Sequence, residues 1–269
     1  MSVITISRGT FSGGKILAEC LTQQLGFRNI DRDVIVERAA ASGVSQEELR
    51  NALEKPPGFL ERFRHRKYTY LALIQAALAE EVRTGKVVYH GNAGHLLLKG
   101  GTPVLRTRII APLEFRLEMC RQRLKLSRAE ALTYIEKVDQ DRRKWTQYLY
   151  GVDWGDPALY DLVLNLEFIT ICEACNIIAS TVKQRCFEFT PEGQASMNDL
   201  ALASRVKAQL ALDPATSHLE VEVGCQAGVV FIRGRLAAID EVEEVRRVAG
   251  AVAGVTEVNL EDLVLTSRS

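Results

Sequence analysis

The sequence predicts a three-layer α/β domain with a five-stranded parallel sheet, followed by a small α+β domain. Three observations support this. Short apolar segments alternate with longer helical ones over residues 3–184, which is typical of a parallel sheet with helices on both faces. A glycine-rich segment joins the first strand to the first helix. After residue 189, hydrophobic periodicity is lost and a shorter second series of elements begins.

The first domain, residues 1–189, is expected to alternate strands and helices. We predict strands at 3–7, 28–30, 87–90, 105–111 and 160–166. The main helices are expected at 16–25, 34–41, 59–84, 127–150 and 170–184. Helix boundaries follow from local signals. Gly26 and Gly85 end two helices, and Ser45 and Ser127 each precede a helix that they can cap.

A linker is expected at residues 190–197, where proline and glycine interrupt the apolar pattern. Residues 198–269 then form the second domain. We predict a helix at 199–212, strands at 219–223 and 229–233, a helix at 239–253 and a last strand at 258–265.

Composition narrows the class of protein. The chain of 269 residues is 47% hydrophobic and 25% charged, as a folded globular protein requires. Lys plus Arg and Asp plus Glu both number 34, which argues against a nucleic-acid partner. Six scattered cysteines favour reduced thiols, and the first residues resemble neither a signal peptide nor a membrane span. We therefore expect a cytoplasmic protein.

The segment from Gly9 to Lys15 matches G-x-x-x-x-G-K between a predicted strand and a predicted helix, the context of a P-loop. Its amides, the helix N-terminus and the lysine would form an anion-binding cradle. The alternative is a tight turn that uses glycine only for its geometry. The expected nucleotide-binding residues are Gly9, Thr10, Phe11, Ser12, Gly13, Gly14, Lys15 and Ile16. Ile16 lacks the hydroxyl that could bind Mg²⁺, so we expect no protein metal ligand in this loop.

With this loop in place, residues 1–185 resemble the cytidylate kinase-like family of P-loop nucleoside-monophosphate kinases. The loop region and the end of the second strand, Asn29 to Asp33, are similar to that family. The later stretches that carry the resemblance are Thr107 to Pro112, Arg116, Asp139, Arg142, Tyr148, Gly151 to Trp154, Asp156, Pro157 and Tyr160 to Asn165.

The resemblance implies ATP as phosphoryl donor, with Mg²⁺ held through phosphates and water. It implies catalytic roles for Lys15 on the donor phosphates and for Arg142 and Arg143 on a lid helix. It also implies that the acceptor is bound by Asp31, Asp33, Arg108 and Arg116. For each arginine the alternative is a solvated helix face.

Three positions depart from the family pattern. Phe11 stands at a loop glycine, Asn92 stands at an expected arginine, and Ile16 removes a hydroxyl. Two functions therefore stay open. The chain is an ATP-dependent kinase of a nucleoside monophosphate, CMP being favoured only by resemblance, or it is a catalytically weak nucleotide sensor that signals through its second domain. We favour the phosphotransferase.

Residues 198–265 resemble a BON domain, through 200–212, 221–223, 228–234 and 254–258. Such a module implies docking to a protein or lipid ligand, self-association, or simple packing on the first domain. We assign no metal to Cys172 and Cys175, which lie in an apolar helical run. The basic stretch at 62–67 is interpreted as a solvated helix face, and His90 and His95 receive no role.

Overall fold

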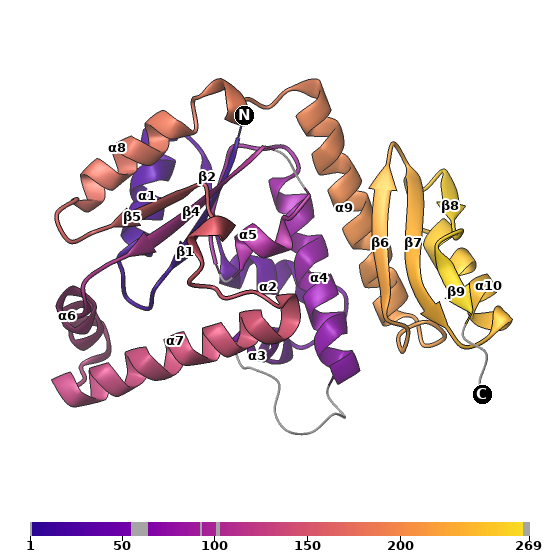
Figure 1. Cartoon of the computed structure of the whole chain (residues 1–269), viewed down its shortest axis with the longest axis horizontal. Coiled ribbons are helices and arrows are strands. Elements are labelled where there is room, and N and C mark those ends of the chain that lie inside the picture. Colours follow the sequence, from indigo (N-terminus) through magenta and orange to yellow (C-terminus); the bar gives the residue numbers. More distant parts are fainter. Residues whose placement is uncertain (1, 55–63, 92, 101–102, 266–269) are drawn as a thin grey trace.

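The computed structural model describes residues 2–54, 64–91, 93–100 and 103–265. A five-stranded sheet with strand order β2-β3-β1-β4-β5, parallel throughout, forms the centre of the first domain and confirms the predicted fold class (Figure 1). Its strands are β1 (Val3–Arg8), β2 (Arg28–Asp31), β3 (Val87–His90), β4 (Val104–Ile110) and β5 (Leu162–Asn165).

Helices cover both faces of this sheet because apolar side chains alternate along its strands. Ile4 and Val88 face α1 (Gly14–Leu25) and α8 (Ile171–Thr181), which pack against one another (Figure 1). Val3, Val87 and Tyr89 face the opposite core. That core is completed by α2 (Arg32–Ala40), α3 (Gln46–Glu54), α4 (Arg64–Val82) and α5 (Gly94–Leu97).

Two further helices form an arm at the edge where the strands end: α6 (Leu113–Leu124) and α7 (Arg128–Tyr150). They pack through a small core of Leu117, Cys120, Ala131 and Ile135. Ser127 and Glu130 form the predicted capping box at the start of α7. A short 3₁₀ helix, η2 (Pro157–Leu159), precedes β5, and another, η3 (Arg185–Phe187), follows α8.

The second domain is a four-stranded mixed sheet packed on two helices. Its elements are α9 (Pro191–Leu212), β6 (Val221–Gln226), β7 (Val229–Leu236), α10 (Ile239–Gly250), β8 (Glu257–Asn259) and β9 (Leu263–Leu265). Strand β6 is antiparallel to β7, whereas β8 and β9 both pair with β7 in parallel. The prediction of a single strand at 258–265 is therefore wrong. The side chain of Asn259 accepts from the amide of Glu261 and turns the chain between two short strands.

The expected linker at 190–197 is helical in the structure. Thr190 caps the first turn of α9 by accepting from the amide of Gly193, and Pro191 occupies the first turn, where its missing N–H costs nothing. From there α9 continues to Leu212 along α4 (Figure 1). Within the described residues, no helix is long and apolar enough to span a membrane.

Candidate active site

The glycine-rich loop joins β1, the middle strand of the sheet, to α1. Phe11 and Gly13 have φ angles of 61° and 81°, whereas Ser12 between them lies outside the left-handed region. Alternation of this kind turns successive amides to one side and forms an anion-binding nest. The hydroxyl of Ser12 is used internally, since it donates to the carbonyl oxygen of Gly9 at 2.6 Å.

The arm formed by α6 and α7 is held against this loop through Thr10. Asp139 Oδ1 accepts from the Thr10 amide at 3.1 Å and from Thr10 Oγ1 at 2.7 Å. Arg116 donates through Nε to the Thr10 carbonyl oxygen at 2.8 Å and through Nη2 to Asp139. Arg142 Nη1 donates to Thr10 Oγ1 and to the carbonyl oxygen of Arg8, both at 3.1 Å.

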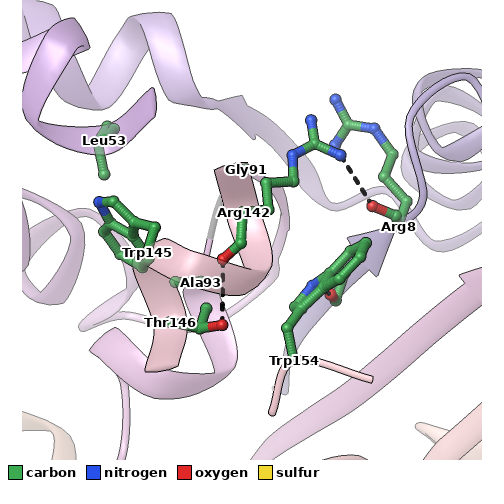
Figure 2. A pocket seen from close by; sticks show the side chains of 9 residues that line it. Arg8, Leu53, Gly91, Ala93, Arg142, Trp145, Thr146 and Trp154 are labelled. Atoms are coloured by element: carbon green, nitrogen blue, oxygen red, sulfur yellow. Dashed lines mark hydrogen bonds between the residues drawn. The ribbon is translucent and has the colours of Figure 1, made fainter. Parts of the chain in front are cut away.

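Arg8, the last residue of β1, brings a further guanidinium group to the loop. Its side chain crosses Gly14 so closely that a Cβ there would lie 2.2 Å from Arg8 Cδ. Its Nη1 donates to the carbonyl oxygen of His90 at 2.9 Å. Figure 2 shows the guanidinium groups of Arg8 and Arg142 close together, and both residues line one pocket. The pocket is lined by Ser7, Arg8, Leu53, Gly91, Ala93, Arg142, Trp145, Thr146 and Trp154.

Burial and charge act together on these arginines. Desolvation, together with the positive charge of the neighbouring Arg142, lowers the pKa of Arg8 to about 10. Burial also lowers the pKa of Arg142, although the carboxylate of Asp139 opposes that shift. Like charges held together out of water are unfavourable unless an anion lies among them. The arrangement therefore suits a phosphate group.

Two buried histidines lie next to this pocket. Burial lowers the pKa of His90 to about 4, helped by Arg8 and Lys15 and opposed by Asp31. Burial likewise lowers the pKa of His95 to about 4. Within the described part of the chain, His90 Nδ1 and His95 Nε2 have no hydrogen-bond partner. Both rings are therefore neutral near pH 7.

The structure brings some predicted site residues together and leaves others apart. Thr10, Arg116 and Arg142 meet at the loop, as described above. Lys15 does not join them in this conformation, because its side chain is 54% exposed and Nζ lies 4.0 Å from Glu19 Oε1. Ile16 is exposed beside it. Arg143 is exposed on α7, with Nε 3.8 Å from Asp153 Oδ1.

The predicted acceptor residues have structural contacts of their own. Asp31 caps α2 by accepting from the amides of Asp33 and Val34. Asp33 is exposed and pairs with Arg50 at 3.3 Å. Arg108 is buried, donates to the carbonyl oxygen of Trp154 at 2.7 Å and lies 4.1 Å from the centre of the Trp154 ring. Asn92 lies outside the described residues. So do residues 62 and 63 of the basic stretch, and the side chains of residues 64–67.

Sequence reasoning missed Arg8 and gave Asp139 no role of its own. The signal for Arg8 was a charged residue at the end of a buried strand, directly before the loop. Asp139 and Arg142 are spaced i, i+3 on α7, so they share one face of that helix. The same spacing also occurs on solvated helix faces, which is why the sequence could not separate the two cases.

Nothing in the described part of the site forms a metal centre. No cluster of three or more His, Cys, Asp or Glu side chains suited to a metal occurs among the described residues. Ile16 is apolar, and Ser12 Oγ is engaged by Gly9. The residues present therefore do not fit a protein-held Mg²⁺.

The sheet order, the nest and the arginine-bearing arm define the protein as one with a P-loop nucleotide-binding fold. The chain belongs to the cytidylate kinase-like family, whose family model matches residues 3–167, and residues 198–263 match the BON domain. Both resemblances found in the sequence are thereby confirmed.

Named relatives agree with this assignment, and a solved structure shares the fold. The chain is 28% identical over 164 residues to a cytidylate kinase of Pyrococcus horikoshii, covering 61% of this chain and 79% of the relative. It is 33% identical over 150 residues to one of Desulfurococcus amylolyticus, covering 54% and 73%. A crystal structure of an uncharacterized protein from Eubacterium ventriosum has a TM-score of 0.55 at 16% identity, covers 68% of this chain and 99% of that chain, and shares the fold.

Proposed function

We propose that this protein transfers the γ-phosphoryl group of ATP to a nucleoside monophosphate, with CMP as the first candidate acceptor. One observation carries the proposal. The Thr10 amide and hydroxyl and the guanidinium of Arg116 all donate to the carboxylate of Asp139, with Arg142 3.9 Å away. Donors that converge on one carboxylate in this way can also hold the oxygens of a phosphate group.

The loop would bind the donor through the amides of its nest and the N-terminus of α1. Lys15 has a flexible stem and, within the described part of the chain, only a long, exposed ion pair with Glu19. Pairs of this kind contribute little free energy, so its ammonium group is free to move onto the donor phosphates. Gly9 and Gly14 would keep the loop backbone close to the nucleotide.

The arm would supply charge to the reaction. Arg116 and Arg142 already contact the loop and would transfer their hydrogen bonds from Asp139 and Thr10 to phosphate oxygens. Arg143 would act only after α7 moves, since it now faces Asp153. The arm therefore has to shift when the nucleotide binds.

On the acceptor side, we assign Asp31 to the nucleoside monophosphate, since it ends β2 beside His90 at the end of β3. Arg108 would act indirectly, by holding the turn that carries Trp154 against the pocket. Asp33, which faces Arg50, has the weakest geometry of the four acceptor candidates.

ATP is the proposed donor, and Mg²⁺ would be bound by its phosphates and by water. Nothing in the geometry favours the sensing alternative over phosphoryl transfer, and the named relatives are cytidylate kinases. The BON domain would add a docking function, for which the ligand is open.

A coupled assay of ADP formation tests the proposal. ATP with Mg²⁺ is offered with CMP, dCMP, UMP, AMP or GMP at millimolar concentration, and turnover is expected to require a monophosphate and to be fastest with a cytidine nucleotide. The chain has two tryptophans, Trp145 and Trp154, and both line the pocket. Their fluorescence therefore reports ATP binding separately. ATP binding without turnover on any monophosphate would contradict the proposal.

A further inference from the structure

Arg8 lies between the donor loop and the predicted acceptor edge. It ends β1, the middle strand, and its side chain crosses Gly14 of the loop. Its guanidinium reaches the carbonyl oxygen of His90, at the end of the neighbouring strand β3. Asp31 of β2 is the register partner of His90. The side chain therefore spans from the loop that would hold the triphosphate to the strand ends that would hold the monophosphate.

The charge around Arg8 is unbalanced. No carboxylate of the described residues lies within ion-pair distance of its guanidinium. Arg142, the nearest charged group in the pocket (Figure 2), is also positive. The carboxylate of Asp139 bonds Arg116 and Thr10 and lies 3.9 Å from Arg142. Asp139 is thus paired with Arg116 and Arg142 but not with Arg8, and a partly buried excess of positive charge calls for an anionic ligand.

Arg8 also has donors to spare. A guanidinium carries five N–H groups in a planar fork, and among the described residues one of them donates, to the carbonyl oxygen of His90. The guanidinium lies beside that of Arg142, and both residues line the pocket (Figure 2). A planar, doubly donating edge fits the equatorial oxygens of a phosphoryl group.

We propose that Arg8 is a catalytic residue that contacts the phosphoryl group while it passes from donor to acceptor. This inference rests on the function proposed above. In the step, an oxygen of the acceptor monophosphate forms a bond to the γ-phosphorus. The bond from that phosphorus to the β–γ bridging oxygen breaks, and ADP leaves with the electron pair. Any proton on the acceptor oxygen passes to solvent, and Arg8 keeps its own protons throughout.

The position predicts a separation of binding from turnover. Lys15 and the nest amides contact the donor before and during transfer, whereas Arg8 would contact mainly the group in transit. Losing Arg8 should therefore reduce kcat by roughly 10- to 100-fold, the effect of one charge-assisted contact, while Kd for ATP changes by less than about threefold.

The variants Arg8→Gln and Arg8→Lys test this in the full chain. Arg28→Gln is the matched control, since Arg28 is an exposed arginine at the start of β2, where it pairs with Glu81. Kd for ATP is measured by tryptophan fluorescence, and kcat and KM by the coupled assay. In addition, ADP, CMP and Mg²⁺ are mixed with aluminium fluoride, whose planar complex imitates the phosphoryl group in transit. Wild type should bind this mixture more tightly than ADP and CMP alone, and Arg8→Gln should lose that gain.

The outcomes separate the two proposals. If wild type neither turns over nor gains affinity with aluminium fluoride, both the kinase activity and the role of Arg8 are overturned. If wild type is active, and Arg8→Gln changes neither kcat nor the affinity for the aluminium fluoride mixture by more than threefold, only the role of Arg8 is overturned. A loss of ATP affinity as large as the loss of kcat would make Arg8 a support for the loop and would also overturn the inference. Retention of ATP binding with loss of both other properties supports it.

Discussion

Phe11 holds the loop in a backbone conformation that suits glycine. Its φ of 61° lies in the left-handed region, which costs a residue with a Cβ roughly 1–2 kcal/mol. Its ring packs on the core between α6 and α7, and its centroid lies 6.1 Å from that of Tyr134. The side chain therefore offsets backbone strain by fixing the loop to the arm.

Two substitutions of Phe11 separate strain from packing. Both Phe11→Ala and Phe11→Gly lose the ring, but only glycine also relieves the positive φ. In an ordinary helix or strand glycine is less stable than alanine by about 0.5–1 kcal/mol. Here we expect the reverse, with Phe11→Gly more stable than Phe11→Ala by about 1 kcal/mol in urea unfolding. An alanine variant as stable as the glycine variant would show that the left-handed conformation at this position is wrong.

The buried histidines make stability depend on pH. Folded His90 and His95 both have a pKa of about 4, against 6.5 for an unperturbed imidazole. Between these values the unfolded chain binds more protons than the folded one. Above about pH 6.5 the two rings therefore do not reduce the free energy of unfolding. Between about pH 6.5 and pH 4 they reduce it as the pH falls, by about 1.4 kcal/mol per pH unit for each ring.

Urea unfolding at pH 7 and pH 5.5 measures this effect, in a range where most carboxylates stay ionised. Wild type should lose stability at the lower pH, and the double variant His90→Asn, His95→Asn should lose much less. His218→Gln removes an exposed ring in the second domain and leaves both buried rings in place, so it should behave as wild type does. An equal loss in the double variant would place the proton uptake elsewhere.

At the scale of elements, the arm formed by α6 and α7 is tied to the loop by one carboxylate. Asp139 receives the hydrogen bonds of Thr10 and Arg116, which are the groups that a phosphate would need. Nucleotide binding must therefore compete with Asp139. The arm is closed on the loop in this conformation, and its opening is part of the free energy of binding.

Asp139→Asn should weaken this closure. The amide keeps an acceptor for Thr10 but removes the charge opposite Arg116 and Arg142, so inorganic tripolyphosphate should bind about tenfold more tightly, equal to about 1.4 kcal/mol. The fold should lose about 1–3 kcal/mol of stability, since a partly buried guanidinium loses its partner. Calorimetric titration measures the affinity. Glu136→Gln removes the same charge from an exposed position one turn earlier in α7 and should change neither property.

Elements with strong local signals could be predicted from the sequence. The strand β3 was placed at its observed bounds, and Ser127 marked the start of α7 because its capping box is a local interaction. The start of α9 was missed because Pro191 and Gly193 suggest a break, whereas Thr190 and Pro191 here begin a helix. The division between β8 and β9 was missed because the turn at Asn259 is decided by one side chain.

The site was predictable only where its residues belong to one segment. The loop and its nest follow from seven consecutive residues. The contacts of Asp139 with Thr10 join positions 129 residues apart, and the direction of Arg8 depends on how β1 and β3 align. Lys15 was predicted inside the cluster because its place in the motif is fixed, but the rotamer of an exposed lysine is set by its surroundings.

At the scale of the whole molecule, α9 belongs to two cores. One face carries Met197 and Ala208, which pack with the core around α4. Another face carries Leu202, Val206 and Leu210, which pack under the sheet of the second domain. The spacing of four residues in the second group matches one stripe of a helix. A helix that is apolar on two faces packs in the cores of both domains, as an irregular linker could not.

Substitution of Ala208 tests whether the two faces of α9 pack separately. Ala208→Glu places a carboxylate in the contact between α4 and α9, where burial of an unpaired charge costs about 3 kcal/mol or more. Gln209→Glu adds the same charge at the next position, which is exposed, and should have no such effect. In hydrogen exchange, Ala208→Glu should lose protection in α4 and the first half of α9. Peptides from β6 and β7 should keep theirs, because Leu202, Val206 and Leu210 still pack against that sheet. Equal loss of protection in all four elements would mean that the two cores unfold together, and would contradict separate packing of the two faces of α9.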